Sequence, residues 1–224
     1  MDNHVDGSGR SDRLERGVQR FKERVYRGNR RFFEGLEEGQ RPHTLFITCS
    51  DSRVDPTLLT DSRPGELFIV RNIANIVPPY RRTEEYVSTT AAIEYALLAL
   101  KVSSIVVCGH SNCGGCAALL GDPAALAAMP HTERWLELAR EDGFPPSGMA
   151  ASVLERENVV RQANRLLGYP TVRERVADGS LAIHAWHYAI GRGAVRRWQA
   201  EAGAFRPLPA IAKSTRRRRP KRSS

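Results

Sequence analysis

The stretch VSSIVVCGHSNCGGCAALL, residues 102–120, decides the fold because a strand, a tight turn and a helix follow one another within it. Its first half is almost continuously apolar, as expected for a strand covered on both faces of a parallel sheet. The same stretch holds three cysteines and one histidine. Cys113 and Cys116 form a C-x-x-C that could be a redox pair, whereas His110 and Cys113 could be half of a metal site.

Two other apolar runs, HTLFITC (43–49) and ELFIVRN (66–72), predict further strands covered on both faces. Residues 181–190, followed by GRG and AVRRWQ, indicate a strand and a hairpin. Helical patterns fill residues 11–39, 89–101 and 151–170. Strands that alternate with helices predict an α/β fold with a mostly parallel central sheet flanked by helices, an N-terminal helical arm, and a C-terminal strand or hairpin at the sheet edge.

Length and composition indicate one globular domain with a basic tail. The chain has 224 residues, 41% of them hydrophobic and 26% charged, which is enough to bury a core. It contains no apolar run typical of a membrane span or a signal peptide, so we expect a cytoplasmic protein without membrane association. We predict a single domain at residues 1–212, including an arm at 1–39, and a disordered tail at 213–224.

The net charge of +9 comes mostly from this tail, KSTRRRRPKRSS. A solvated tail is the favoured interpretation, and a tail that binds an anionic partner such as nucleic acid is the alternative. The arm carries one apolar stripe, interrupted near Gly28, that consists of Leu14, Val18, Phe21, Val25, Phe32 and Leu36. The stripe could pack on the protein's own core or on a second subunit, and the sequence leaves both alternatives open.

Polar side chains follow two of the predicted strands. The first strand ends at Cys49 and continues as CSDSR, and the third ends in CGHSNC. Because the C-terminal ends of neighbouring parallel strands meet at one edge of a sheet, Cys49, His110 and Cys113 converge if these strands are neighbours. Two thiolates and an imidazole suit zinc with an open fourth position. In an extended chain, Asp51 and Arg53 would point to the same side as Cys49.

The segments CSDSR, ELFIVRNIANIVPP and AAIEYALLALKVSSIVVCGHSNCGG together resemble the β-class carbonic anhydrases, and especially the branch that includes the plant enzymes. The resemblance implies that Cys49, His110 and Cys113 bind one Zn²⁺ per subunit. It also implies that Asp51 and Arg53 form the catalytic dyad, with Asp51 on zinc in a closed state only. The implied substrate-binding groups are Gln40, Phe68, Ile73, Tyr95 and the backbone N–H of Gly114.

The implied activity is the reversible hydration of carbon dioxide to bicarbonate and a proton, by attack of zinc-bound hydroxide that the Asp51–Arg53 dyad orients. Hydrolysis of a CO2 analogue, COS or CS2, on the same fold is the alternative. The family also implies a homodimer or a higher even oligomer. A non-catalytic zinc protein that binds nucleic acid is disfavoured, because a structural site needs neither the dyad nor Gln40. Cys108 and Cys116 are then packing residues.

Overall fold

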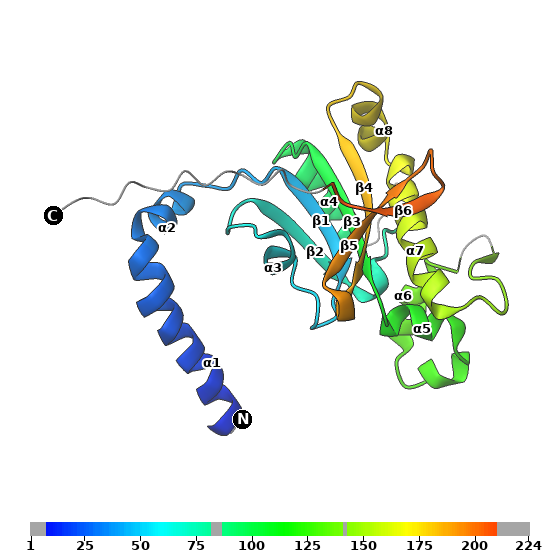
Figure 1. Cartoon of the computed structure of the whole chain (residues 1–224), viewed down its shortest axis with the longest axis horizontal. Helices are drawn as coiled ribbons and strands as arrows, with labels where there is room; N and C mark the ends of the chain where they lie inside the picture. Colours follow the sequence, from blue (N-terminus) through cyan, green and yellow to red (C-terminus); the bar gives the residue numbers. More distant parts are fainter. Residues whose placement is uncertain (1–7, 82–86, 141–142, 210–224) are drawn as a thin grey trace, which may run out of the picture. The chain divides into compact units, whose positions relative to one another are not determined.

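The computed structural model describes residues 8–81, 87–140 and 143–209, and it divides into two compact units, Met1–Arg41 and Pro42–Ser224. The described part of the first unit is nearly continuous helix from Ser8 to Glu37 (Figure 1). It consists of α1 (Ser8–Arg20), a π-helical segment η1 (Phe21–Tyr26), a 3₁₀ turn η2 (Arg27–Asn29) and α2 (Arg30–Glu37). Gly28 lies in the 3₁₀ turn, so the predicted interruption of the arm is confirmed. The predicted tail at 213–224 lies outside the described residues.

The apolar stripe of this first unit is largely exposed. The exposed fractions are 75% for Leu14 and 66% for Val18, and 45% and 44% for Phe21 and Val25. At the other end of the unit, the Phe33 ring contacts three other aromatic rings at centroid distances of 5.2–5.5 Å, those of Phe21, Tyr26 and Phe32. Aromatic contacts therefore hold α2 to the preceding helical turns, while Leu14 and Val18, the stripe residues on α1, remain open to solvent.

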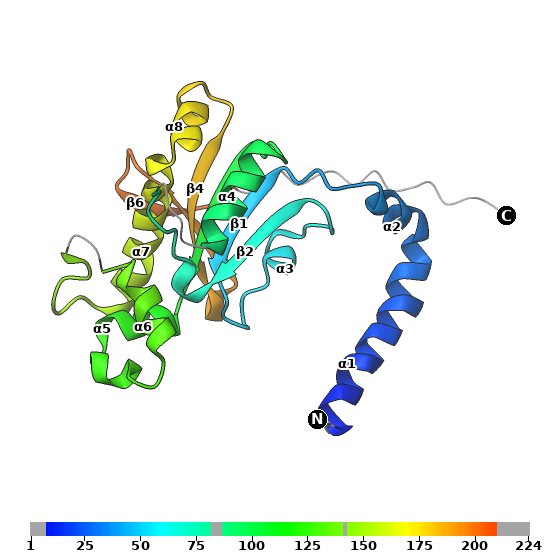
Figure 2. The same ribbon diagram turned by 180° about the vertical axis from the view of Figure 1, so that it is seen from behind.

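The second unit is built on a six-stranded sheet in the order β2-β1-β3-β4-β5-β6 (Figures 1 and 2). The parallel strands are β1 (Thr44–Cys49), β2 (Leu67–Asn72), β3 (Ser104–His110) and β4 (Ala182–Ala189). Strands β5 (Ala194–Gln199) and β6 (Ala204–Pro207) add antiparallel at one edge. The α/β fold with its C-terminal hairpin is therefore confirmed. The turn between β4 and β5, η7 (Ile190–Arg192), ends at Gly193, whose φ of 57° favours glycine.

Helices cover the sheet unequally. The side chains of β1 and β3 that share one face pack against α4 (Ser88–Leu98), α7 (Ala151–Arg165) and α8 (Pro170–Ala177) in the larger core. The opposite face carries a smaller cluster around Phe46, Val106 and Cys108. The remaining helical segments are α3 (Pro56–Thr60), η3 (Ile73–Asn75), α5 (Gly114–Leu120), η4 (Pro123–Leu126), α6 (Pro130–Glu137) and η6 (Leu166–Gly168). In the described part of the chain, no helix combines the length and apolarity needed to cross a membrane.

One strand prediction was wrong in its burial. All six residues of β1 are buried, as predicted, but β2 alternates between half-buried and exposed residues. The reason is that β2 is an edge strand with a single neighbour, so Ile69 is 37% exposed. The prediction that matters for the site is confirmed, since β1 and β3 are neighbours with Thr48 opposite Cys108. Cys49 and His110 therefore end adjacent strands at the same edge of the sheet.

Candidate metal centre

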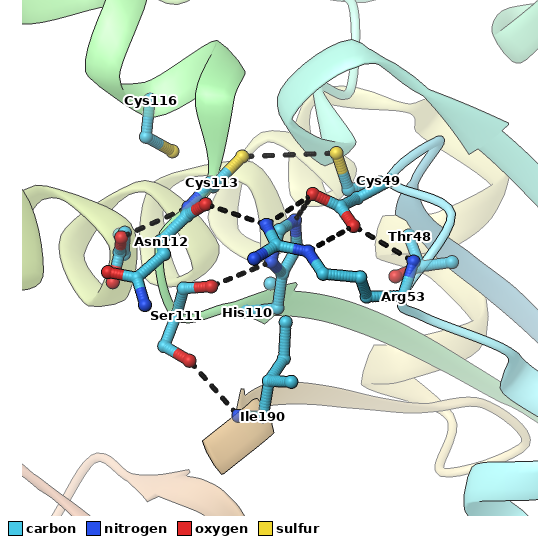
Figure 3. A network of polar contacts seen from close by, with 12 residues as sticks. Thr48, Cys49, Arg53, His110, Ser111, Asn112, Cys113, Cys116 and Ile190 are labelled. Carbon is cyan, nitrogen blue, oxygen red and sulfur yellow. Dashed lines mark hydrogen bonds and ion pairs between the residues drawn. The ribbon is translucent and has the colours of Figure 1, made fainter.

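Cys49, His110 and Cys113 meet at the ends of β1 and β3, where the two sulfur atoms face each other (Figure 3). Their ligand atoms all lie within 4.8 Å of one another, and the three residues are only 4%, 1% and 2% exposed. The Sγ atoms of Cys49 and Cys113 are 3.8 Å apart. Two sulfurs that each bind a tetrahedral zinc at about 2.3 Å would be about 3.8 Å apart, so the spacing fits zinc.

The imidazole of His110 is oriented for metal binding. Its Nδ1 lies 3.0 Å from the carbonyl oxygen of Ser111, which makes Nδ1 the protonated nitrogen. Its Nε2 is buried and has no hydrogen-bond partner among the described residues. A buried nitrogen without a partner is costly, and a metal ion would satisfy it. The turn after β3 allows this arrangement because Asn112 has a φ of 56°, a left-handed conformation that asparagine tolerates.

The electrostatics of the three residues also fit a cation. The hydrogen bond with Cys113 and burial raise the pKa of the Cys49 thiol to about 12. The hydrogen bond with Cys116 and burial raise the pKa of Cys113 to about 12, although its contact with Cys49 acts in the opposite direction. Burial lowers the pKa of His110, but its interactions with Cys49, the Ser111 carbonyl and Asp51 outweigh burial and leave the pKa raised. Protein groups alone thus disfavour the thiolates, and a metal ion would be the charge that stabilises them.

Asp51 and Arg53 form a two-pronged ion pair beside this cluster, and Figure 3 labels Arg53. The Arg53 side chain donates from Nε to Oδ1 at 2.9 Å and from Nη2 to Oδ2 at 2.7 Å. These hydrogen bonds hold the pKa of the Asp51 carboxyl well below its usual range. The Oδ2 atom of Asp51 lies 3.8 Å from Nε2 of His110. The prediction of an extended backbone from Cys49 to Arg53 is wrong, because the Val54 N–H donates to the Asp51 carbonyl and closes a turn there.

Two groups that the sequence did not single out, the Asn112 carbonyl and the Arg71 side chain, fix this loop. The Asn112 carbonyl accepts a hydrogen bond from Nη2 of Arg53 at 2.9 Å. Arg71 donates from Nε to the Cys49 carbonyl at 3.2 Å and from Nη2 to the Asp51 carbonyl at 2.7 Å. The signal that could have revealed Arg71 is its charge at the end of the apolar run ELFIVRN, where a strand interior would hold an apolar residue.

The predicted substrate-binding residues are distributed unevenly. Ile73 lies next to the cluster, because it follows Asn72, which pairs with Cys49. A Cβ on Gly115 would lie 2.9 Å from Ile73 Cγ2, so η3 packs directly on the first turn of α5. The neighbouring Gly114 is exposed and has open space around it.

Phe68 and Tyr95 lie elsewhere in the chain. Their rings contact each other at 5.9 Å, but Phe68 pairs with Leu45, four residues before Cys49. Four strand residues span roughly 13 Å, so the structure does not bring this pair to the metal cluster of the same chain. Gln40 is exposed and belongs to the separate unit Met1–Arg41, and its substrate role stays a prediction.

The other two cysteines pack in the core. Cys116 is 1% exposed and lies 3.8 Å from Nδ2 of Asn158, and it is not one of the three clustered ligands. Cys108 is fully buried, and burial raises the pKa of its thiol to about 12. All four cysteines are free thiols. These environments agree with the packing role predicted for Cys108 and Cys116.

Comparison with known proteins identifies the family. The family model described as carbonic anhydrase matches residues 44–195, which include all three clustered ligands and the Asp51–Arg53 pair. The chain belongs to the β-class carbonic anhydrases. It is 37% identical over 203 residues to the carbonic anhydrase of Helicobacter pylori strain J99, covering 86% of this chain and 92% of the relative. It is 40% identical to the carbonic anhydrase of Pseudomonas aeruginosa over 204 residues, or 88% of this chain and 90% of the relative.

Solved structures agree with this assignment. The β-carbonic anhydrase CcaA superposes with a TM-score of 0.81 at 37% identity, covering 88% of this chain and 99% of that one. A tetrameric β-carbonic anhydrase of Sordaria macrospora gives a TM-score of 0.71 at 33% identity, covering 84% and 95%. This carbonic anhydrase therefore catalyses the hydration of carbon dioxide, and Cys49, His110 and Cys113 form the zinc site typical of its class.

Proposed function

We propose that this carbonic anhydrase hydrates carbon dioxide with Asp51 and Arg53 as its catalytic dyad, beside zinc held by Cys49, His110 and Cys113. The observation that carries the proposal is the position of the Asp51 carboxylate, 3.8 Å from the unpartnered Nε2 of His110. Zinc bound by these three ligands would lower the pKa of a coordinated water far below its bulk value of about 15.7 and so supply hydroxide for the reaction.

The dyad holds and orients a hydrogen-bond acceptor. Because Arg53 keeps the pKa of Asp51 low, the carboxylate is ionised at neutral pH and can accept a hydrogen bond from the attacking oxygen. The two-pronged ion pair fixes the direction of the carboxylate, and the Asn112 carbonyl fixes Arg53 in turn. Engagement of both carboxylate oxygens by Arg53 supports an open resting state, in which Asp51 leaves the fourth zinc position free.

Two further groups would act on the substrate. The Gly114 backbone N–H, exposed at the start of α5, and the Gln40 amide are donors suited to the oxygen that becomes negative as bicarbonate forms. Ile73 supplies apolar surface beside the first turn of α5, and its side chain is 39% exposed. Such a wall suits carbon dioxide, which is small and apolar.

The apolar pair Phe68 and Tyr95 is assigned to the site of a second copy. Tyr95 is 50% exposed, and the pair lies several residues from the metal cluster of its own chain. A homodimer or a higher even oligomer would let each chain complete the substrate pocket of another. The open apolar stripe on α1 supports such an assembly, as does the tetrameric state of the Sordaria macrospora relatives.

The remaining assignments concern the branch of the family, the domain bounds and the cellular compartment. We place the chain in the branch that includes the plant enzymes, on the strength of the combined CSDSR, ELFIVRNIANIVPP and CGHSNCGG segments. We assign residues 1–212 to one functional domain whose arm is 1–39, and we regard the tail at 213–224 as dispensable for turnover. The enzyme is assigned to the cytoplasm.

The proposal is tested by Asp51→Asn, with stopped-flow CO2 hydration and zinc analysis on the same samples. The variant is expected to keep its zinc and to lose hydration by at least about 100-fold, since a neutral amide is a poor acceptor. Asp55→Asn is the matched control, because Asp55 caps α3 through the Leu58 N–H and has no hydrogen bond among the described residues to Cys49, His110, Cys113 or Arg53. Full hydration by zinc-loaded Asp51→Asn would overturn the assigned role.

A further inference from the structure

Helix α7 lies unusually close to the strand that carries His110. A Cβ added to Gly109 would lie only 2.3 Å from Cγ2 of Val159 and 3.5 Å from the Glu155 carbonyl oxygen. Only glycine on β3 therefore lets α7 approach the sheet at this point. The consequence is that side chains on one face of α7 reach the loops that build the zinc site.

This face of α7 carries three buried polar residues at helical spacing, Glu155, Asn158 and Gln162, which are 5%, 0% and 1% exposed. Asn158 donates from Nδ2 to the Ala74 carbonyl at 2.9 Å. Gln162 accepts a hydrogen bond from the Val77 N–H at 2.9 Å and donates to Asn158 Oδ1 at 2.9 Å. Two members of this row therefore hold the segment that follows β2, and they hold it through backbone groups.

Glu155 occupies the end of the row nearest to the zinc ligands. Its Oε1 accepts a hydrogen bond from the backbone N–H of Cys113 at 3.2 Å. Its Oε2 lies 3.7 Å from Nε2 of His187, beyond ordinary hydrogen-bond distance. A buried carboxyl group without hydrogen-bond partners is costly, so a glutamate here needs a partner that offsets this cost. Among the described residues, the group within hydrogen-bond distance is the backbone N–H of the zinc ligand Cys113.

We propose that Glu155 is a positioning residue for the zinc centre, which fixes the backbone of Cys113 and thereby the direction of the Cys113 thiol. Cys113 is the residue that precedes α5, and its own side chain makes no capping hydrogen bond. The carboxylate of Glu155 therefore supplies an anchor from α7 at the point where the chain turns from β3 into α5. The same anchor orients the next residue, Gly114, whose N–H is a proposed substrate donor. This inference rests on the zinc centre of the proposed function.

The test is zinc affinity, measured by competition with a chromogenic chelator, together with the absorption spectrum of the cobalt-substituted protein. Outer groups that hold metal ligands typically contribute 10–100-fold in metal affinity. Glu155→Leu is expected to raise the zinc Kd by at least about tenfold and to alter the cobalt–thiolate bands. Glu155→Gln keeps a carbonyl acceptor in the same place, so its Kd is expected within about threefold of the parent value.

Gln162→Leu is the matched control. It also removes a buried side-chain acceptor on α7, but that acceptor binds the backbone N–H of Val77 and not that of Cys113. It should lose folding stability and keep the parent zinc Kd and cobalt spectrum. If Glu155→Leu does not fold, Glu155→Asp replaces it. Aspartate keeps the carboxyl group but is one methylene shorter, so its oxygen cannot reach the Cys113 N–H. The same rise in the zinc Kd is expected.

Three outcomes would overturn the inference: parent-like zinc affinity in Glu155→Leu or Glu155→Asp, an equal loss in Gln162→Leu, or no rescue by Glu155→Gln. Failure of the parent protein itself to bind zinc would instead contradict the metal centre. The two failures are therefore distinguishable.

Discussion

The contact between Gly109 and Val159 predicts a large effect from one methyl group. In Gly109→Ala the new Cβ would lie 2.3 Å from Val159 Cγ2, whereas carbon atoms in contact are about 3.5–4.0 Å apart. Val159 is fully buried, so α7 would have to retreat from β3 by more than about 1 Å. Overpacking of this kind costs about 1–3 kcal/mol, and we expect a value near 3 kcal/mol because the shortfall is large.

The assay is urea unfolding of the zinc-loaded protein, with Val159→Ala and the double variant completing a thermodynamic cycle. Val159→Ala alone should cost about 2 kcal/mol, because it removes buried methyl groups. In the double variant the methyl group added at position 109 occupies part of the vacated space, so the combined cost should fall short of the sum by at least about 1 kcal/mol. Gly35→Ala is the control, since Gly35 lies in α2 with open space around it and the change should be neutral or stabilising. Additivity within about 0.5 kcal/mol would refute the packing argument.

Three further predictions concern single side chains. Cys113→Ser should lose zinc, whereas Cys116→Ser should retain it, as metal analysis would show; zinc loss in both would contradict the ligand set. Arg53→Lys keeps the charge but cannot bridge both Asp51 oxygens, so kcat/KM should fall about tenfold at full zinc content, and an unchanged value would argue against the dyad. Burial, with the charge of Arg156, lowers the pKa of His187 to about 4. As pH falls, His187 is therefore protonated in the unfolded chain before it is protonated in the folded protein. The free energy of unfolding should fall by up to about 3 kcal/mol as pH drops from about 6.5 to 4. His187→Gln should reduce that acid loss in unfolding experiments at about pH 7 and 4.5, and an equal loss would refute the assignment.

The sequence predicted the strand ends correctly because apolar runs, and the polar residues that follow them, are local signals. Cys49 and His110 each follow such a run, and parallel neighbours must bring these ends together. The same local reasoning failed for β2, because whether an apolar strand lies at an edge depends on the order of strands in the sheet. It also gave an extended geometry for Asp51 and Arg53, where the Val54 N–H closes a turn.

The supporting groups were less accessible to prediction. Glu155 and Arg71 bond to backbone atoms of segments far away in the sequence. No residue spacing in the sequence predicts the contact of Glu155 with Cys113 or that of Arg71 with Cys49. Phe68 and Tyr95 could be named from a resemblance, but only the strand register shows that they lie away from the metal cluster of their own chain.

The central claim is that the Cys49–His110–Cys113 centre, completed by Asp51 and Arg53, makes the chain a zinc-dependent carbonic anhydrase. The most direct measurement is a zinc titration of metal-free protein, followed by stopped-flow CO2 hydration at each point. Hydration is predicted to rise in proportion to bound zinc and to level off at one zinc per chain. Protein that has taken up one zinc per chain but hydrates no carbon dioxide between about pH 6.5 and 9 would contradict the claim.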